Sequence, residues 1–557
     1  MVLLANILWF FSCLPKYFLF LINAGRVRKK QEQILKRYLK RHANTEFGRQ
    51  YNFLKIKSVK VYRENVPIFS YEDFLVYIKK IKNGEQNILT RDKVLFLEPT
   101  SGSTSASKYI PYTNSLKREF QTGIGAWIID LFLHCPSLLL YKAYWLITPN
   151  NQQVNKDKNV GFDDDSEYLG FFSKLLVNRI LVVPNIVSKI SNEKSFFYVT
   201  LLFLLKNKNI GLLSIWSPTI LDLYIKFFQE NFDSLILDLG TGEINKKIII
   251  DNSIRSFLQK ELGKNLKRAN EIKSLINLNN NSTKSVFETI WPRIKVISCW
   301  QDASSKKYAE NIKKYFPNAE IQGKGLISTE CFATFPLAGV NGKVLSVNSH
   351  FFEFQELIDE KKLYLAHELK KGGRYRLIVT TGGGLYRYNT GDAVEIAGFY
   401  NQAPIINFIG KIDNVSDLFG EKINEQFVNQ IVKELINEYQ VLSDFFLVSP
   451  EEIDGKGMYV LFIEINEKRD LSQMEKSFEN KLCQNFHYNH CRKLGQLNHA
   501  RIFIIERDGL KDYYSRCLSR GQKLGDIKNK VLDNSIDWSK YFKGHYNYRM
   551  TGIHVNK

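Results

Sequence analysis

The chain has 557 residues, of which 44% are hydrophobic and 24% charged, so it is long enough to divide into two or three domains with buried cores. Its formal net charge is +21 at pH 7, but the basic residues are spread along the chain and no helix-turn-helix, zinc-finger or RNA-binding signature accompanies them. We therefore expect a solvated basic surface and no nucleic-acid partner. The seven cysteines are odd in number and widely spaced, which argues against a disulfide framework and for a reducing, cytoplasmic compartment.

Residues 1–30 form an apolar segment with a basic end. Val2 to Ile22 is almost wholly apolar and is followed by the basic run 26–30. By length this segment could span a membrane, and the basic flank would then keep the rest of the chain in the cytoplasm. Pro15 and Lys16 in mid-stretch favour the alternative, a helix that lies on a membrane surface or packs on the first domain. We expect a cytoplasmic protein with peripheral membrane contact through residues 1–30.

Further along the chain, helical patterns alternate with short apolar runs. Gln31–Phe47 and Leu116–Leu133 have the spacing of helices, and Ser70 is placed to cap another. Apolar runs typical of buried strands recur at Val94–Leu97, Tyr144–Thr148, Ile180–Val183, Leu212–Ile215, Val296–Cys299, Leu345–Val347 and Leu377–Thr380. This alternation predicts an α/β domain with a largely parallel sheet.

A tract rich in hydroxyl groups follows the first of these strands. It contains Ser101, Gly102, Ser103 and Thr104, and Lys108 closes it. Small side chains and a glycine let several backbone N–H groups and hydroxyls face one anion, and the lysine adds a positive charge. The tract therefore fits a phosphate-binding loop, although it lacks the Gly-Lys-Ser/Thr ending of a P-loop. The alternative is an ordinary Ser/Thr-rich surface turn.

A second tract runs from Gly323 through Gly325 to Ser328-Thr329-Glu330. It follows a short strand predicted at 319–322, so Thr329 and Glu330 should lie at the mouth of that strand. A hydroxyl beside a carboxylate suits a nucleotide phosphate and its Mg²⁺. The same three residues are also common at the N-terminus of a helix, and this alternative stays open.

A third tract comprises Tyr386-Arg387-Tyr388 and Gly391-Asp392, and a further segment reaches Lys411. The pattern predicts a strand, a Gly-Asp turn and a second strand. Asp392 would then be exposed at the turn, where a carboxylate can accept both ribose hydroxyls of a nucleotide.

In this order the three tracts resemble the nucleotide-binding motifs of the auxin-responsive acyl-acid amido synthetases, the Gretchen Hagen family, which belongs to the acyl-adenylate-forming enzymes. The likeness extends from Thr45-Glu46-Phe47-Gly48-Arg49 to Gly521-Gln522-Lys523, and the third tract looks more like bacterial than plant members. The resemblance implies an α/β fold with a large N-terminal adenylate-forming domain over 31–419 and a small, mobile α+β C-terminal domain over 420–557.

The resemblance also implies an ATP site with a bound Mg²⁺. Lys108 and Lys523 would be catalytic, the latter carried to the nucleotide by the small domain, and Glu330 would hold the metal. The nucleotide-binding residues would be Ser101, Gly102, Ser103, Thr104, Gly323, Gly325, Ser328, Thr329, Tyr388, Asp392 and Lys411. Two positions depart from the family pattern. The family usually has a glycine near Ala106, and it usually has an arginine at the position of Lys411. Lysine keeps the positive charge of arginine but cannot form its bidentate hydrogen bonds.

The implied activity is that of an ATP-dependent acid–amino acid ligase. A carboxylic acid would attack ATP to give an acyl-adenylate and pyrophosphate, and the amine of an amino acid would then displace AMP to form an amide. Two alternatives stay open: an adenylate-forming ligase with another acceptor, such as coenzyme A, and a non-catalytic, membrane-associated interaction protein on the same fold.

Overall fold

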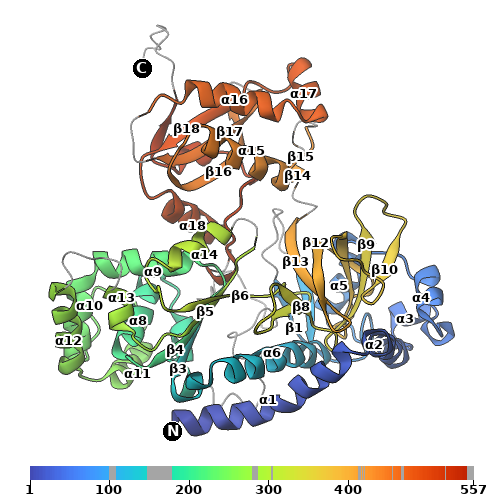
Figure 1. Ribbon diagram of the computed structural model, residues 1–557, viewed down its shortest axis with the longest axis horizontal. Helices are drawn as coiled ribbons and strands as arrows, with labels where there is room; N and C mark the ends of the chain where they lie inside the picture. The colour runs from blue at the N-terminus through green and yellow to red at the C-terminus, as the bar shows by residue number, and fades with distance from the viewer. Residues whose placement is uncertain are drawn as a thin grey trace. The chain divides into compact units, whose positions relative to one another are not determined.

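The computed structural model describes residues 1–99, 108–146, 179–278, 286–302, 305–411, 415–416, 418, 421–453, 456–465, 469–520, 522 and 524–547. They form two compact units, the first made mainly of residues up to 409 and the second mainly of residues from 410 onward (Figure 1). The domain limits 1–30, 31–419 and 420–557 remain predictions.

The first unit begins with helices whose ends follow from local sequence. α2 starts before the predicted Gln31–Phe47 helix. It also ends before it, because Thr45 begins a new helix by accepting a hydrogen bond from the Gly48 N–H. Ser70 is the N-cap of α5, and its N–H donates to the Asp73 carboxylate (2.8 Å), which confirms the predicted cap. The bounds are α1 Val2–Ala24, α2 Val27–His42, α3 Glu46–Gln50, α4 Val59–Asn65 and α5 Tyr71–Lys82.

Helix α1 runs alongside α6 (Asn114–His134) and the short 3-10 helix η2 (Pro136–Leu140) (Figure 1). The Asn6 amide donates to the carbonyls of Leu139 (2.9 Å) and Tyr141 (3.1 Å), and the ring of Trp9 meets that of Phe132 edge-on at 5.9 Å. Among the described helices, α1 alone is long and apolar enough to cross a membrane. In this structure one of its faces lies on protein.

A four-stranded parallel sheet with order β3-β4-β5-β6 forms one half of the unit, and helices connect its strands. It confirms the predicted alternation, but Ile180–Val183 forms only an isolated bridge between Leu181 and Ala143 rather than a strand. The strands are β3 Lys142–Trp145, β4 Ile210–Ser214, β5 Val296–Cys299 and β6 Glu320–Gly323. The helices are α8 Glu193–Lys206, α9 Thr219–Glu230, α10 Phe232–Thr241, α11 Asn252–Leu262, α12 Leu266–Leu278, α13 Val286–Ile290 and α14 Lys306–Ile312.

The other half contains a seven-stranded sheet with order β10-β9-β11-β12-β13-β8-β7. Its pairs β9–β10, β9–β11, β11–β12, β8–β13 and β7–β8 are antiparallel, so the expectation of a largely parallel sheet is wrong for this part of the chain. Only Asn401 and Gln402 lie between β12 and β13, and so short a connection permits only antiparallel pairing. The strands are β7 Thr334–Pro336, β8 Lys343–Leu345, β9 Phe351–Glu356, β10 Leu363–Leu365, β11 Arg374–Thr380, β12 Tyr388–Tyr400 and β13 Ala403–Lys411.

The Gly391-Asp392 pair does not form the predicted turn. Both residues lie inside the continuous strand β12, where the pairing with β11 shifts register and Gly391 has φ of 72°. A residue with positive φ in a disrupted ladder is typical of a β-bulge, which glycine allows without strain. Asp392 is therefore buried in a strand, and the expectation that it is exposed at a turn is wrong.

The second unit is α+β, as predicted. Its sheet has order β16-β17-β18-β19 and is antiparallel except for β17–β18, and its buried side chains form a core of their own. The elements are β14 Val415–Ser416, β15 Ile423–Asn424, α15 Glu425–Glu438, β16 Ser443–Ile453, β17 Lys456–Ile465, α16 Ser472–Leu482, α17 Phe486–Lys493, β18 Arg501–Ile505, α18 Gly509–Ser519 and β19 Gly544–Tyr546.

Candidate nucleotide site

The two strands that flank the hydroxyl tract pair with each other. β1 (Val94–Pro99) and β2 (Tyr109–Thr113) are antiparallel, and Pro99 lies opposite Tyr109, so the tract begins and ends at one point of the fold. The predicted site residues Ser101, Gly102, Ser103 and Thr104 lie outside the described residues, as does Lys523. Lys108 is described, at the entrance to β2.

Lys108 lies against α5. Its ammonium is 5.3 Å from the centroid of the Tyr71 ring, close enough for a cation–π attraction. The Tyr71 hydroxyl in turn accepts a hydrogen bond from the Tyr109 N–H (2.6 Å). Tyr71 therefore fixes the end of the hydroxyl tract to the first turn of α5.

The second tract forms a hairpin, not a helix N-terminus. The Ser328 N–H donates to the Cys331 carbonyl (3.0 Å), so Thr329 and Glu330 occupy the tip of a tight turn. An ideal Cβ on Gly325 would lie 1.8 Å from the Thr334 carbonyl oxygen, so only glycine lets the two arms approach. The structure thus presents the hydroxyl and the carboxylate on one half-exposed tip.

Tyr388 joins the second and third tracts. Burial raises its pKa, and the negative charges of Glu330 and Asp392 raise it further. The pKa of Tyr71 is likewise raised by burial, and Glu330 contributes. Both carboxylates therefore lie within electrostatic reach of Tyr388, and Glu330 also within reach of Tyr71, beside which Lys108 lies. One residue from each of the three tracts converges on this tyrosine pair.

The middle residue of Tyr386-Arg387-Tyr388 holds the framework together. Arg387 is buried, donates through Nε to Glu353 (3.0 Å), and shares that carboxylate with Arg63 (2.8 Å). Its carbonyl accepts a hydrogen bond from the N–H of Phe69 (3.0 Å), a residue that leads into α5. This part of the third tract therefore positions α5 and Tyr388. Lys411, the last residue of β13, belongs to the second unit.

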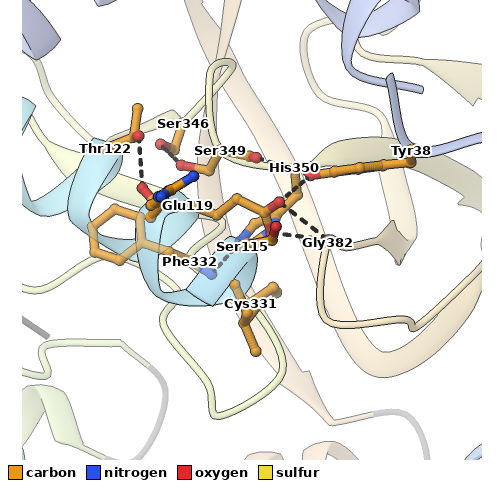
Figure 2. Close-up of polar contacts among 12 residues, drawn as sticks. Tyr38, Ser115, Glu119, Thr122, Cys331, Phe332, Ser346, Ser349, His350 and Gly382 are labelled. Atoms are coloured by element: carbon orange, nitrogen blue, oxygen red, sulfur yellow. Dashed lines mark hydrogen bonds and ion pairs between the residues drawn. The ribbon is translucent and has the colours of Figure 1, made fainter. Parts of the chain in front are cut away.

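A buried polar network supports the hairpin from behind (Figure 2). Glu119 of α6 accepts hydrogen bonds from the Tyr38 hydroxyl (2.7 Å) and the Gly382 N–H (3.0 Å), and one of its carboxylate oxygens lies 2.9 Å from His350 Nδ1. His350 Nε2 accepts a hydrogen bond from the Phe332 N–H (3.0 Å), which places the proton of a neutral imidazole on Nδ1. The network ties the arm that carries Glu330 to the turn that precedes the third tract.

An aromatic wall lies at the carboxyl ends of the parallel strands, where ligands bind in open α/β sheets. The Lys324 ammonium donates to Ser214 Oγ (2.7 Å) and lies 5.0 to 5.5 Å from the rings of Trp127, Trp145 and Trp216. The lysine is buried, and all three tryptophan rings lie within the range of a cation–π attraction to its ammonium.

Sequence reasoning missed Tyr71, Glu119, His350 and the tryptophans. Tyr71 follows a recognisable N-cap, but nothing in the sequence shows that it meets Lys108. Glu119 and His350 are separated by more than 200 residues and stand in unremarkable surroundings. Only tertiary contacts reveal these residues.

Solved structures with the same two-domain adenylate-forming architecture define the class of the fold. The chain matches an acyl acid amido synthetase solved in complex with 2,4-DB with a TM-score of 0.79 at 22% identity, over 94% of each chain. It also matches a 2-hydroxyisobutyryl-CoA ligase in complex with 2-HIB-AMP with a TM-score of 0.51 at 10% identity, over 92% of this chain and 90% of that one. At these identities the likeness shows the fold alone.

Family models identify the chain further. The GH3 family N-terminal domain matches residues 23–321, the central domain residues 343–411 and the C-terminal domain residues 424–535. The chain belongs to the GH3 family.

Curated relatives agree with this assignment. The chain is 26% identical to the indole-3-acetic acid-amido synthetase GH3.15 of Arabidopsis thaliana over 79% of this chain and 78% of the relative. It is 22% identical to the 4-substituted benzoates-glutamate ligase GH3.12 of the same plant, over 91% and 88%. The predicted family, its adenylate-forming fold and its ligase class are confirmed.

Proposed function

We propose that this chain is an ATP-dependent acyl-acid amido synthetase that joins a small carboxylic acid to the amine of an amino acid. The observation that carries the proposal is the convergence of Lys108, Glu330 and Asp392 on Tyr71 and Tyr388, since a basic group, a carboxylate beside a hydroxyl and a second carboxylate suit the phosphates and the ribose of one nucleotide. Family membership adds the reaction class.

The proposed chemistry has two balanced steps. In the first, a carboxylate oxygen of the acid bonds to the α-phosphorus of ATP while the bond to pyrophosphate breaks. In the second, the amine nitrogen attacks the acyl carbon, AMP leaves and the nitrogen loses a proton. The first step needs negative charge neutralised and reactants held in line, for which Lys108, Lys523 and the hydroxyl tract are proposed.

The residues present fit a Mg²⁺ ion bound together with nucleotide. Mg²⁺ usually takes one or two protein carboxylates and completes its shell with phosphates and water. Glu330 at the half-exposed hairpin tip is such a ligand, with Thr329 beside it for the α-phosphate. When bound, the metal would neutralise phosphate charge; Asp392 would hold the ribose, and Gly323 and Gly325 would lie along the adenine.

The aromatic wall is proposed as the acid side of the site. Trp127, Trp145 and Trp216 lie at or against the carboxyl ends of the parallel strands, and the second tract leaves β6 at the same edge. Flat apolar rings around a buried ammonium favour an acid with an apolar, planar body. We also propose that the chain works in the cytoplasm, with peripheral membrane contact through residues 1–30.

The test is pyrophosphate release by the purified full chain with Mg-ATP, screened over pools of carboxylic acids and amino acids, with mass spectrometry of the products. We expect acid-dependent pyrophosphate and an amide product. A thioester formed with coenzyme A would show that the acyl acceptor is coenzyme A and not an amine. If no acid gave pyrophosphate, the catalytic proposal would be contradicted.

A further inference from the structure

Helix α1 presents a continuous apolar stripe to solvent. Leu4, Leu8, Phe11, Phe18 and Ile22 are three, four or seven residues apart, so they share one face of the helix. Each is between 47% and 62% exposed. We call these five residues the exposed stripe. Large apolar side chains that are exposed together over a whole helix mark an interaction surface, whereas single exposed ones do not.

The opposite face of α1 is anchored to the protein. Trp9, Cys13 and Phe20 are buried, Phe20 packs on Phe335 at 4.8 Å between ring centroids, and the Asn6 amide is bound by backbone carbonyls. To span a bilayer, α1 would have to leave these partners. With them in place, only the exposed stripe is available to an apolar environment.

The positive charge at the end of α1 indicates what kind of partner the exposed stripe binds. The helix ends in a basic flank in which Arg26, Arg28 and Lys29 are exposed, and Glu32 is the only carboxylate among residues 1–41. Glu32 forms an ion pair with Arg28 (3.0 Å), and a second copy of the chain would bring the same basic residues and leave the charges of Arg26 and Lys29 unmatched. Anionic lipid headgroups would neutralise them, and apolar side chains beside basic ones are typical of helices that lie in a membrane interface.

We propose that α1 binds the surface of an anionic lipid membrane, lying in the plane of the interface with the exposed stripe among the acyl chains and the basic flank among the headgroups. The family match starts at residue 23, so all of α1 except its last two residues precedes the part that matches the family model. The inference deepens the proposed membrane contact but does not depend on the proposed chemistry, because lipid binding is measured without acid or nucleotide.

The test is flotation of the full chain with vesicles of phosphatidylcholine alone and of phosphatidylcholine with phosphatidylserine. We expect the wild type to float with the anionic vesicles and to be released by alkaline carbonate. Leu8→Gln, Phe11→Gln and Phe18→Gln combined should weaken binding by about a hundredfold or more, since three apolar side chains no longer leave water. A matched control, Leu237→Gln with Ile249→Gln, changes two equally exposed apolar residues elsewhere in the same unit and should float like the wild type.

A second variant tests the charge. Arg26→Gln, Arg28→Gln and Lys29→Gln combined should lower affinity for anionic vesicles by about tenfold to a hundredfold and lose the preference over neutral ones. The proposal is overturned if the wild type floats with neither vesicle, if the stripe variant floats like the wild type, or if carbonate does not release the protein. It is also overturned if light scattering shows a dimer that the stripe variant dissociates without any vesicle binding.

Discussion

Glu330 stands at the tip of a turn, within electrostatic reach of Tyr71 and Tyr388. Glu330→Gln keeps the size and shape of the side chain but removes the negative charge that a metal ion would need. We therefore expect the rate of pyrophosphate release to fall by about a hundredfold or more, with little change in the free energy of unfolding. The measurement is acid-dependent pyrophosphate release over a range of Mg²⁺ concentrations. Glu320→Gln, ten residues earlier in β6, is the matched control and should behave like the wild type. Equal rates for Glu330→Gln and the control would contradict the assigned role.

His42 gives a prediction about acid stability. It is fully buried, its Nδ1 accepts a hydrogen bond from the Arg91 N–H (3.1 Å), and burial lowers its pKa from 6.5 to about 4. Between these values the unfolded chain binds the proton and the folded chain does not, so stability is lost as the pH falls from 6.5 toward 4. From pH 7 to pH 5 this residue should cost the wild type about 2 kcal/mol of unfolding free energy.

His42→Asn checks that prediction, because its amide oxygen can accept the Arg91 N–H without titrating. Urea unfolding at pH 7 and pH 5 should show a smaller loss in the variant, by about that amount. An identical loss in both proteins would assign the acid sensitivity to other groups.

At the scale of elements, the hairpin 325–334 depends on one glycine. Gly325→Ala would bring a Cβ onto the Thr334 carbonyl and force the arms apart, so we expect pyrophosphate release to fall by about tenfold to a hundredfold as Glu330 is displaced. Gly398→Ala in β12 is the control, since its Cβ would meet Ile405 only at 3.9 Å. Unchanged kinetics in Gly325→Ala would show that the arms can separate without moving the tip.

The network behind the hairpin predicts a positioning role for His350 (Figure 2). His350→Ala leaves Glu119 buried without its imidazole partner and the Phe332 N–H without an acceptor, so we expect about 3 kcal/mol or more of lost unfolding free energy and a raised KM for ATP. His350→Gln can replace both contacts and should recover the KM more fully than the stability. His134→Ala, also involving a histidine beside a carboxylate but an exposed one, is the control. If His350→Ala loses stability but keeps the KM of the wild type, the network is structural only.

Local patterns predicted the elements better than their pairing. The strand at Val94–Leu97, the cap at Ser70 and the parallel strands were predictable because a few neighbouring residues decide them. The antiparallel sheet was not, because buried apolar runs look alike in both kinds of sheet. The Gly391-Asp392 pair was taken for a turn since a bulge uses the same residue types.

At the scale of the whole molecule, Lys108 comes together with Glu330 and Asp392 although the chain separates it from each of them by more than 200 positions. Sequence order and spacing could predict the three tracts, and the resemblance predicted that they share a nucleotide. The tyrosines at which they meet could not be predicted, because each meets its partners only after α5, the hairpin and β12 have packed.

The last prediction concerns Lys523, which the resemblance implies to be catalytic. If this lysine acts only on the phosphates during adenylation, Lys523→Ala should lower acid-dependent pyrophosphate release by about a hundredfold or more, because one positive charge is lost from the transition state. The same variant should still form amide when supplied with a synthetic acyl-adenylate and an amino acid, since AMP is already in place as leaving group. Both steps are measured separately, by pyrophosphate and by mass spectrometry of the amide, with the exposed Lys476→Ala in α16 as control. Equal loss of both steps would contradict a role confined to adenylation, and no loss in either step would remove Lys523 from the proposed site.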